Sequence, residues 1–152
     1  MFDIRRWFSS APAAGGNATT RLCDNPGSVR LLAILPGAGD AEQLRGVVEQ
    51  LDWSVSIAGT ESQAMALLQG EPITAVICDQ DLPDEDWRDV ITRIAALPHA
   101  PCVLLASRVM DQYLWNEVIQ CRGYDVVSKP FQREELRRVL SFALSFPERP
   151  SL

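Results

Sequence analysis

The stretch AVICDQDLPDEDW, residues 75–87, joins an apolar run directly to a run of acids. Residues 75–78 are small or apolar and lead into Asp79, and four more acidic residues follow within the next seven positions. A short continuous apolar run is typical of a strand inside a parallel sheet that is covered on both faces. The carboxylate at its end either opens a polar loop that caps the next helix or belongs to a site for a cation or a phosphoryl group.

The alternation of apolar run and amphipathic helix repeats on both sides of this stretch. Strands are predicted at 29–35, 53–58, 73–78, 102–106 and 124–127, and each is followed by apolar residues at helical spacing. Five strand–helix pairs within residues 29–146 predict an α/β fold, a doubly wound five-stranded parallel sheet with helices on both faces.

Composition and charge limit the classes of function. The chain of 152 residues is 47% hydrophobic and 22% charged, which fits one soluble domain. Residues 1–28 are predicted to be a flexible N-terminal segment and linker, 29–146 the domain, and 147–152 a tail. The net charge of −6 argues against a nucleic-acid surface. No apolar run is long enough for a membrane span, and cysteines without paired spacing favour a reducing, cytoplasmic location.

Functional groups of a doubly wound sheet gather at the carboxyl ends of its strands. Asp79 follows the third predicted strand and Lys129 the fifth, so these side chains are expected to meet although 50 positions separate them. The pair is either a structural salt bridge or the centre of an active site.

Two sequence elements carry a resemblance to a known family. Asp79 with Pro83 in CDQDLPDEDW, and Lys129 with Pro130 and Phe131 in VVSKPF, resemble the response-regulator receiver domains of two-component signalling. The resemblance covers residues 29–146. It implies a flavodoxin-like sheet with strand order 2-1-3-4-5.

The resemblance also implies roles for these residues. Asp79 would accept a phosphoryl group from a sensor histidine kinase or phosphotransfer protein, Lys129 would pair with the phosphoryl oxygens, and the peptide bond before Pro130 would be cis. A carboxylate that attacks a phosphoryl group meets like-charge repulsion, so cations are needed. In this family Mg²⁺ supplies most of that charge.

The stretch after the first strand departs from the family pattern. Receivers place two consecutive acids there to hold Mg²⁺, whereas this chain has Pro36 and Gly37. The next carboxylate, Asp40, is predicted to be the N-cap of the first helix, paired with Gln43 three residues on. A metal would then rest on Asp79 with Asp40 or the backbone carbonyl of Asp81, which makes a weak site, and we expect autophosphorylation to be slow or absent.

Other family positions are altered as well. The hydroxyl residue that reaches the phosphoryl group is Ser107 when counted back from Lys129, while counting forward from Pro101 places Ala106 there. The aromatic residue expected three positions before the lysine is Val126. The glycine expected eight positions after the acceptor is Trp87, which is predicted to enlarge the loop beside the site.

Three hypotheses follow for the function, and the chain is not expected to be an enzyme under the two that are favoured. The first is a single-domain receiver phosphorylated on Asp79 in a phosphorelay. The second is a pseudo-receiver, an interaction module that works without phosphorylation. The third is a flavodoxin-like ligand-binding or enzymatic domain that uses the loop 37–39. For the first two, the helix 4–strand 5–helix 5 face is the expected surface for a downstream protein, and a homodimer is a further candidate assembly.

Overall fold

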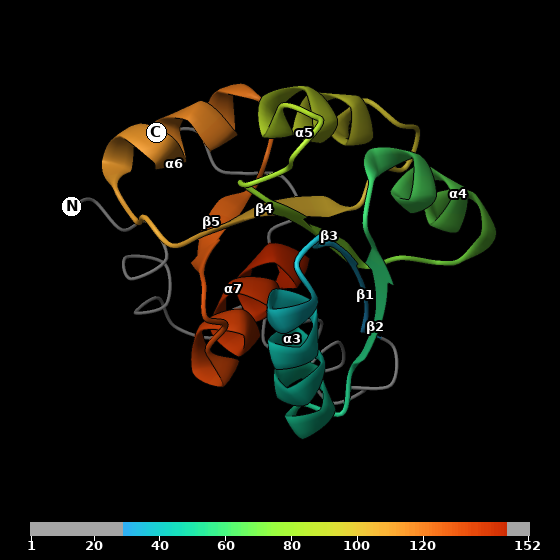
Figure 1. Cartoon of the computed structure of the whole chain (residues 1–152), viewed down its shortest axis with the longest axis vertical. Helices are drawn as coiled ribbons and strands as arrows, with labels where there is room; N and C mark the ends of the chain where they lie inside the picture. Colours follow the sequence, from blue (N-terminus) through green and yellow to red (C-terminus); the bar gives the residue numbers. More distant parts are fainter. Residues whose placement is uncertain (1–28, 146–152) are drawn as a thin grey trace.

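Five short strands lie side by side in one parallel sheet in the order β2-β1-β3-β4-β5 (Figure 1). The computed structural model describes residues 29–145, so the predicted linker at 1–28 and tail at 147–152 lie outside the described residues. The strands are β1 (Arg30–Ile34), β2 (Ser54–Ala58), β3 (Ala75–Asp79), β4 (Cys102–Ser107) and β5 (Asp125–Ser128). The predicted fold class and strand order are confirmed.

Five helices alternate with these strands and cover both faces of the sheet. They are α3 (Ala38–Gln50), α4 (Glu61–Gly70), α5 (Trp87–Ala95), α6 (Gln112–Gln120) and α7 (Arg133–Ser145). Buried residues of α3 and α7 belong to one core cluster, and those of α4, α5 and α6 belong to the other. Figure 1 shows the same division, with α3 and α7 on one side of the sheet and the other three helices opposite.

The apolar strands serve both cores at once. In β1, Leu31 and Ala33 pack into the cluster beneath α3 and α7, whereas Leu32 and Ile34 pack into the cluster on the opposite face. Successive side chains of a strand point to opposite faces, so a strand covered on both sides must be apolar without alternation. This requirement explains the continuous apolar runs of the sequence.

Side-chain caps fix where three of the helices begin, and for α6 the cap is Asp111, which accepts from the Leu114 amide at 2.7 Å. Thr60 accepts a hydrogen bond from the Gln63 amide at 3.2 Å, and the Gln63 side chain reaches back to the Gly59 amide at 2.7 Å, so the predicted capping interaction is present. Asp86 caps α5 through the Arg88 amide at 2.9 Å. Such caps satisfy amide groups that have no partner within their own helix.

The predicted cap of the first helix was wrong. The N-cap of α3 is Gly37, and Asp40 lies inside the first turn. Gln43 does not bond back to Asp40; its side chain binds the backbone of Phe131. The sequence pattern of Asp40 and Gln43 looks like a cap, but tertiary partners from the far end of the chain engage both side chains.

The strand ends bring the predicted residues to one edge of the sheet. Asp79 is the last residue of β3 and pairs in register with Ala106, and Ser107 pairs with Ser128, the last residue of β5. Lys129 follows directly. In the part of the chain that the structure describes, no helix is both long and apolar enough to cross a membrane.

Candidate functional site

Asp79 and Lys129 form a buried ion pair at the carboxyl edge of the sheet. The Lys129 Nζ lies 2.6 Å from Asp79 Oδ1, and the two side chains are only 1% and 4% exposed. The amide of Asp81 donates a second hydrogen bond to the same Asp79 oxygen at 3.1 Å. The predicted convergence of the third and fifth strand ends is therefore present, across the end of β4 that lies between them.

Asp40 is the second carboxylate of the site. Its Oδ2 lies 3.2 Å from Lys129 Nζ, and its Oδ1 lies 3.2 Å from a terminal guanidinium nitrogen of Arg108. Asp40 reaches the site from the first turn of α3, and each of its oxygens takes one cation. Sequence reasoning missed Arg108 altogether, because nothing in its neighbourhood indicates a partner 68 positions away.

Asp81 contributes through its backbone and remains mostly in solvent. Its side chain is 76% exposed, and its Oδ2 lies 3.8 Å from Lys129 Nζ. The contact it makes with Asp79 uses the amide N–H. The predicted contribution of its carbonyl to a metal stays a prediction.

The donor set does not suit a divalent cation. Both oxygens of Asp40 and the Oδ1 of Asp79 already accept N–H groups from Lys129, Arg108 or the Asp81 amide. Within residues 29–145, no group of three or more His, Cys, Asp or Glu side chains is placed to hold a metal ion. A hard ion such as Mg²⁺ wants several free oxygens in near-octahedral geometry, and here it would have to displace one of the chain's own cations.

Ser107 and Ala106 take different places at the end of β4. Ala106 is aligned with Asp79 in the sheet, and Ser107 stands one residue beyond it. The Ser107 hydroxyl lies 2.5 Å from Gln80 Oε1 and accepts a hydrogen bond from the Val109 amide at 2.9 Å. These bonds hold the turn that leads into Arg108. Whether Ser107 or Ala106 faces a phosphoryl group stays a prediction.

The segment after Lys129 is fastened to α3. The peptide bond between Lys129 and Pro130 is cis, as the family resemblance implied. The amide of Phe131 donates to Gln43 Oε1 at 2.6 Å, and Gln43 Nε2 donates to the Phe131 carbonyl at 2.8 Å. Gln43 is thus a positioning residue that sequence reasoning had assigned to a helix cap.

The loop and strand residues beside the site are mainly structural. Trp87 does not enlarge the loop as predicted, because it begins α5 and its side chain is buried in the core. Val126 is buried in the same cluster. Pro83 lies exposed in the loop between β3 and α5, and Glu85 in that loop accepts the Glu61 amide at 3.1 Å.

Burial and charge also act on a neighbouring thiol. Cys78 precedes Asp79 in β3 and is fully buried. Burial raises the pKa of the Cys78 thiol well above its usual value, and the negative charge of Asp79 adds to this effect. Cys78 is therefore an inert thiol at neutral pH.

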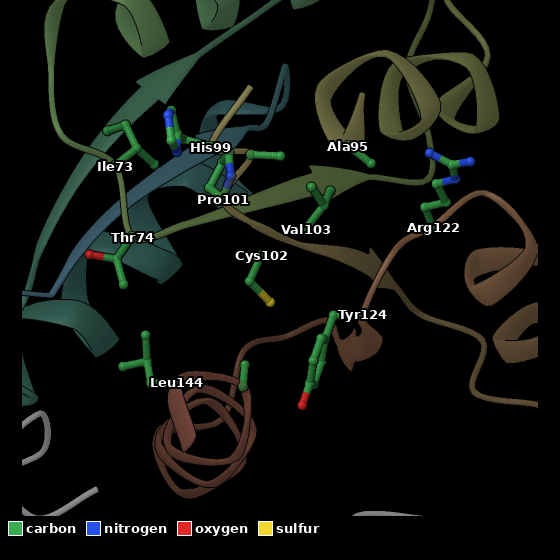
Figure 2. A pocket seen from close by; sticks show the side chains of 12 residues that line it. Ile73, Thr74, Ala95, His99, Pro101, Cys102, Val103, Arg122, Tyr124 and Leu144 are labelled. Atoms are coloured by element: carbon green, nitrogen blue, oxygen red, sulfur yellow. The ribbon is translucent and has the colours of Figure 1, made fainter. Parts of the chain in front are cut away.

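A separate pocket of about 480 Å³ lies at the other end of the sheet, where the strands begin. Figure 2 shows the side chains that line it. It is lined by residues at or just before the beginnings of β3, β4 and β5, among them Thr74, Cys102 and Tyr124. Ligands of doubly wound sheets bind at the carboxyl ends of the strands. Asp79 lies at the carboxyl end of β3, so this pocket at the amino ends of the strands is remote from it and does not extend its site.

Comparison with known proteins agrees with the fold. A model of the response regulator receiver domain matches residues 40–141. The hydrogenase transcriptional regulatory protein HoxA of Bradyrhizobium diazoefficiens is 28% identical over 99 residues, which cover 62% of this chain and 20% of HoxA. The chain therefore spans about a fifth of the length of that relative.

Solved structures share the fold at low sequence identity. A CheY-like response regulator receiver domain protein from Methanospirillum hungatei superposes with a TM-score of 0.67 at 16% identity, over 76% of this chain and 93% of that one. The signal receiver domain of an HD domain-containing protein from Pseudomonas fluorescens gives 0.68 at 24% identity, over 79% and 98%. The receiver domain family model matches more than half of the chain. The chain thus belongs to the response regulator receiver domain family.

Proposed function

We propose that this receiver domain takes a phosphoryl group on Asp79 and passes the resulting change to a partner protein. The observation that carries the proposal is the buried Asp79–Lys129 pair. Both donors that reach Asp79 from within the described residues bind Oδ1. The other oxygen, Oδ2, is then the one available to attack phosphorus.

The proposed transfer needs no group beyond a phosphohistidine donor. The Asp79 carboxylate forms a new O–P bond while the P–N bond of the phosphohistidine breaks, and the released electron pair stays on the imidazole nitrogen, which takes up a proton. Lys129 supplies positive charge where the transferred group carries its negative charge, and such positioning and charge neutralisation dominate phosphoryl transfer.

The donor class is proposed from the family. One similar structure, with a TM-score of 0.65 at 12% identity over 73% of this chain and 84% of that one, is the receiver domain of Ssk1 from Saccharomyces cerevisiae in complex with the histidine phosphotransfer protein Ypd1. We propose a histidine kinase or phosphotransfer protein as the donor for this chain.

The downstream partner is proposed to bind the face formed by α6, β5 and α7, which is the helix 4–strand 5–helix 5 face of the sequence prediction. Tyr113 on α6 is an exposed aromatic residue on it. Trp115 packs partly against the core, and Tyr124 is buried with its ring edge-to-face against Phe142 at 6.1 Å. Tyr113 is accordingly the candidate contact, since exposed aromatic residues favour interfaces.

A small phosphodonor with intact-mass measurement tests the proposal. The wild-type chain is expected to gain the mass of one phosphoryl group, at the slow rate that the sequence predicts, and Asp79→Asn is expected to gain none. Asp81→Asn is the matched control, because Asp81 is an exposed acid beside the site, and it should gain mass like the wild type.

The second candidate is a pseudo-receiver, and the closed network of Asp40 with Lys129 and Arg108 favours it. An unmodified wild-type chain that still binds its partner, with the same affinity as Asp79→Asn, would establish this alternative and reject phosphorylation.

A further inference from the structure

The pair of Arg108 and Asp40 lies at the carboxyl ends of the strands and crosses the end of the strand that carries Asp79. The four charged side chains at this end of the sheet, Asp40, Asp79, Arg108 and Lys129, are called the rim below. Arg108 follows the last residue of β4, and Asp40 lies in the first turn of the helix that follows β1. Because β3 lies between β1 and β4, an ion pair joining these two residues crosses the end of β3, where Asp79 stands. Arg108 is 57% exposed, so its side chain can leave Asp40 and move within the rim.

The charges of the rim balance without any added ion. Asp79 and Asp40 bring two negative charges, and Lys129 and Arg108 bring two positive ones, joined by contacts of 2.6 to 3.2 Å. The carboxylate of Asp81 lies farther away, 3.8 Å from Lys129 Nζ, and is 76% exposed, so water screens most of its charge. A divalent cation entering this rim meets two cations of the chain and must displace one of them. An incoming phosphoryl group meets the opposite situation, because its negative oxygens find two positive groups close at hand.

Arginine suits this second role by its geometry. A guanidinium is planar, permanently charged and able to bind two phosphoryl oxygens at once, whereas lysine acts as a point charge. Lys129 is held on Asp79 at the inner side of the rim, and Arg108 approaches from the solvent side.

We propose that Arg108 replaces the divalent metal ion as the second cation of the Asp79 site. It pairs with Asp40 while Asp79 is unmodified and with the phosphoryl oxygens once Asp79 carries the group. This inference rests on the proposed function for the modified state, but the exclusion of metal by Arg108 stands on the unmodified protein alone.

A titration with Mg²⁺ tests the metal-excluding part on the full chain. Binding is measured by calorimetry for the wild type, Arg108→Gln and Arg108→Lys, with Arg45→Gln as a control, since Arg45 is a similarly exposed arginine on α3 paired only loosely with Glu42. Arg108→Gln is expected to bind Mg²⁺ at least fivefold more tightly than the wild type. Arg108→Lys and Arg45→Gln should match the wild type. Equal affinity of Arg108→Gln and the wild type would overturn the proposal.

Phosphorylation by a small phosphodonor, with Mg²⁺ or with EDTA, tests the second part. The wild type should be modified at similar rates in both conditions, and Arg108→Gln should lose its rate in EDTA and regain it with Mg²⁺. A wild type that is modified only with Mg²⁺ would contradict the inference. If no protein is modified in any condition, the proposed function fails, while the Mg²⁺ titration still decides whether Arg108 excludes the metal.

Discussion

Lys129 neutralises two carboxylates at once from a position that water hardly reaches. Its Nζ lies 2.6 Å from Asp79 and 3.2 Å from Asp40. Breaking a buried pair by removing one partner is costly because the remaining charge is left without compensation, even where the intact pair adds little net stability.

Replacing Lys129 by methionine keeps the length of the side chain and removes its charge. Lys129→Met is expected to lower the free energy of unfolding by about 3–5 kcal/mol at neutral pH, because Asp79 then stays buried and uncompensated. Urea unfolding measures the change. The double variant Lys129→Met with Asp79→Asn should recover part of the loss, and a single variant as stable as the wild type would contradict the proposed coupling.

Cys78 should make stability fall at alkaline pH. Burial raises the pKa of its thiol in the folded protein above the usual 9.0, so above pH 9 the unfolded chain releases a proton that the folded chain keeps. The stabilisation is complete below the unfolded pKa and declines as pH rises, by about 1.4 kcal/mol per pH unit at most.

Urea unfolding of the wild type and Cys78→Ala at several pH values above 9 measures this contribution. Other groups titrate in both proteins, so the difference between their slopes isolates the thiol. The wild type should lose stability more steeply, and parallel slopes would show that Cys78 does not remain protonated in the folded state.

Among the elements, α3 does more than cover the sheet. Its first turn delivers Asp40 to the site, and one turn later Gln43 holds both backbone groups of Phe131, just after the cis peptide bond at Pro130. The helix therefore links the carboxyl end of β1 to that of β5.

Gln43→Ala removes both hydrogen bonds to Phe131 and leaves its backbone groups without these partners. The expected loss is about 1–3 kcal/mol in the free energy of unfolding, as for partly buried polar groups left unsatisfied. Thermal or urea unfolding measures it. Gln50→Ala, at the exposed end of the same helix, is the control and should change stability little. Equal losses in the two variants would show that the Gln43 side chain does not hold the Phe131 segment.

The sequence predicted the elements better than their tertiary contacts. Continuous apolar runs predicted β1, β3 and β4, because burial on both faces demands them. Alternation in WSVSIA predicted β2 and the short YDVV predicted β5, and all five strands were placed to within two residues at each end. Asp79 and Lys129 were predicted to meet because parallel strands share one carboxyl edge. The pairing of Arg108 with Asp40 could not be predicted. It depends on how the first turn of α3 is oriented toward the loop after β4, and local sequence patterns do not determine that orientation.

At the scale of the whole molecule, two cores share one sheet. Leu104 and Leu105 are neighbours in β4, both fully buried, and they pack into opposite clusters. Because every strand lines both clusters, loss of one core should unfold the other, and the domain is expected to unfold in one step.

Leu104→Ala and Leu105→Ala are each expected to lower the free energy of unfolding by about 2–5 kcal/mol. Far-UV circular dichroism and tryptophan fluorescence should report the same urea midpoint in each variant. Arg138→Ala, an exposed change on α7, should leave the midpoint unchanged. A plateau between two transitions would mean that the two faces unfold separately.

The central claim is that Asp79 itself carries the transferred phosphoryl group, and locating that group tests it most directly. After treatment with a phosphodonor, borohydride reduces an acyl phosphate to an alcohol, and peptide mass mapping identifies the altered residue. The account predicts a single altered residue, Asp79, at the end of β3. Alteration at Asp81, at Asp40 or at no residue would contradict it.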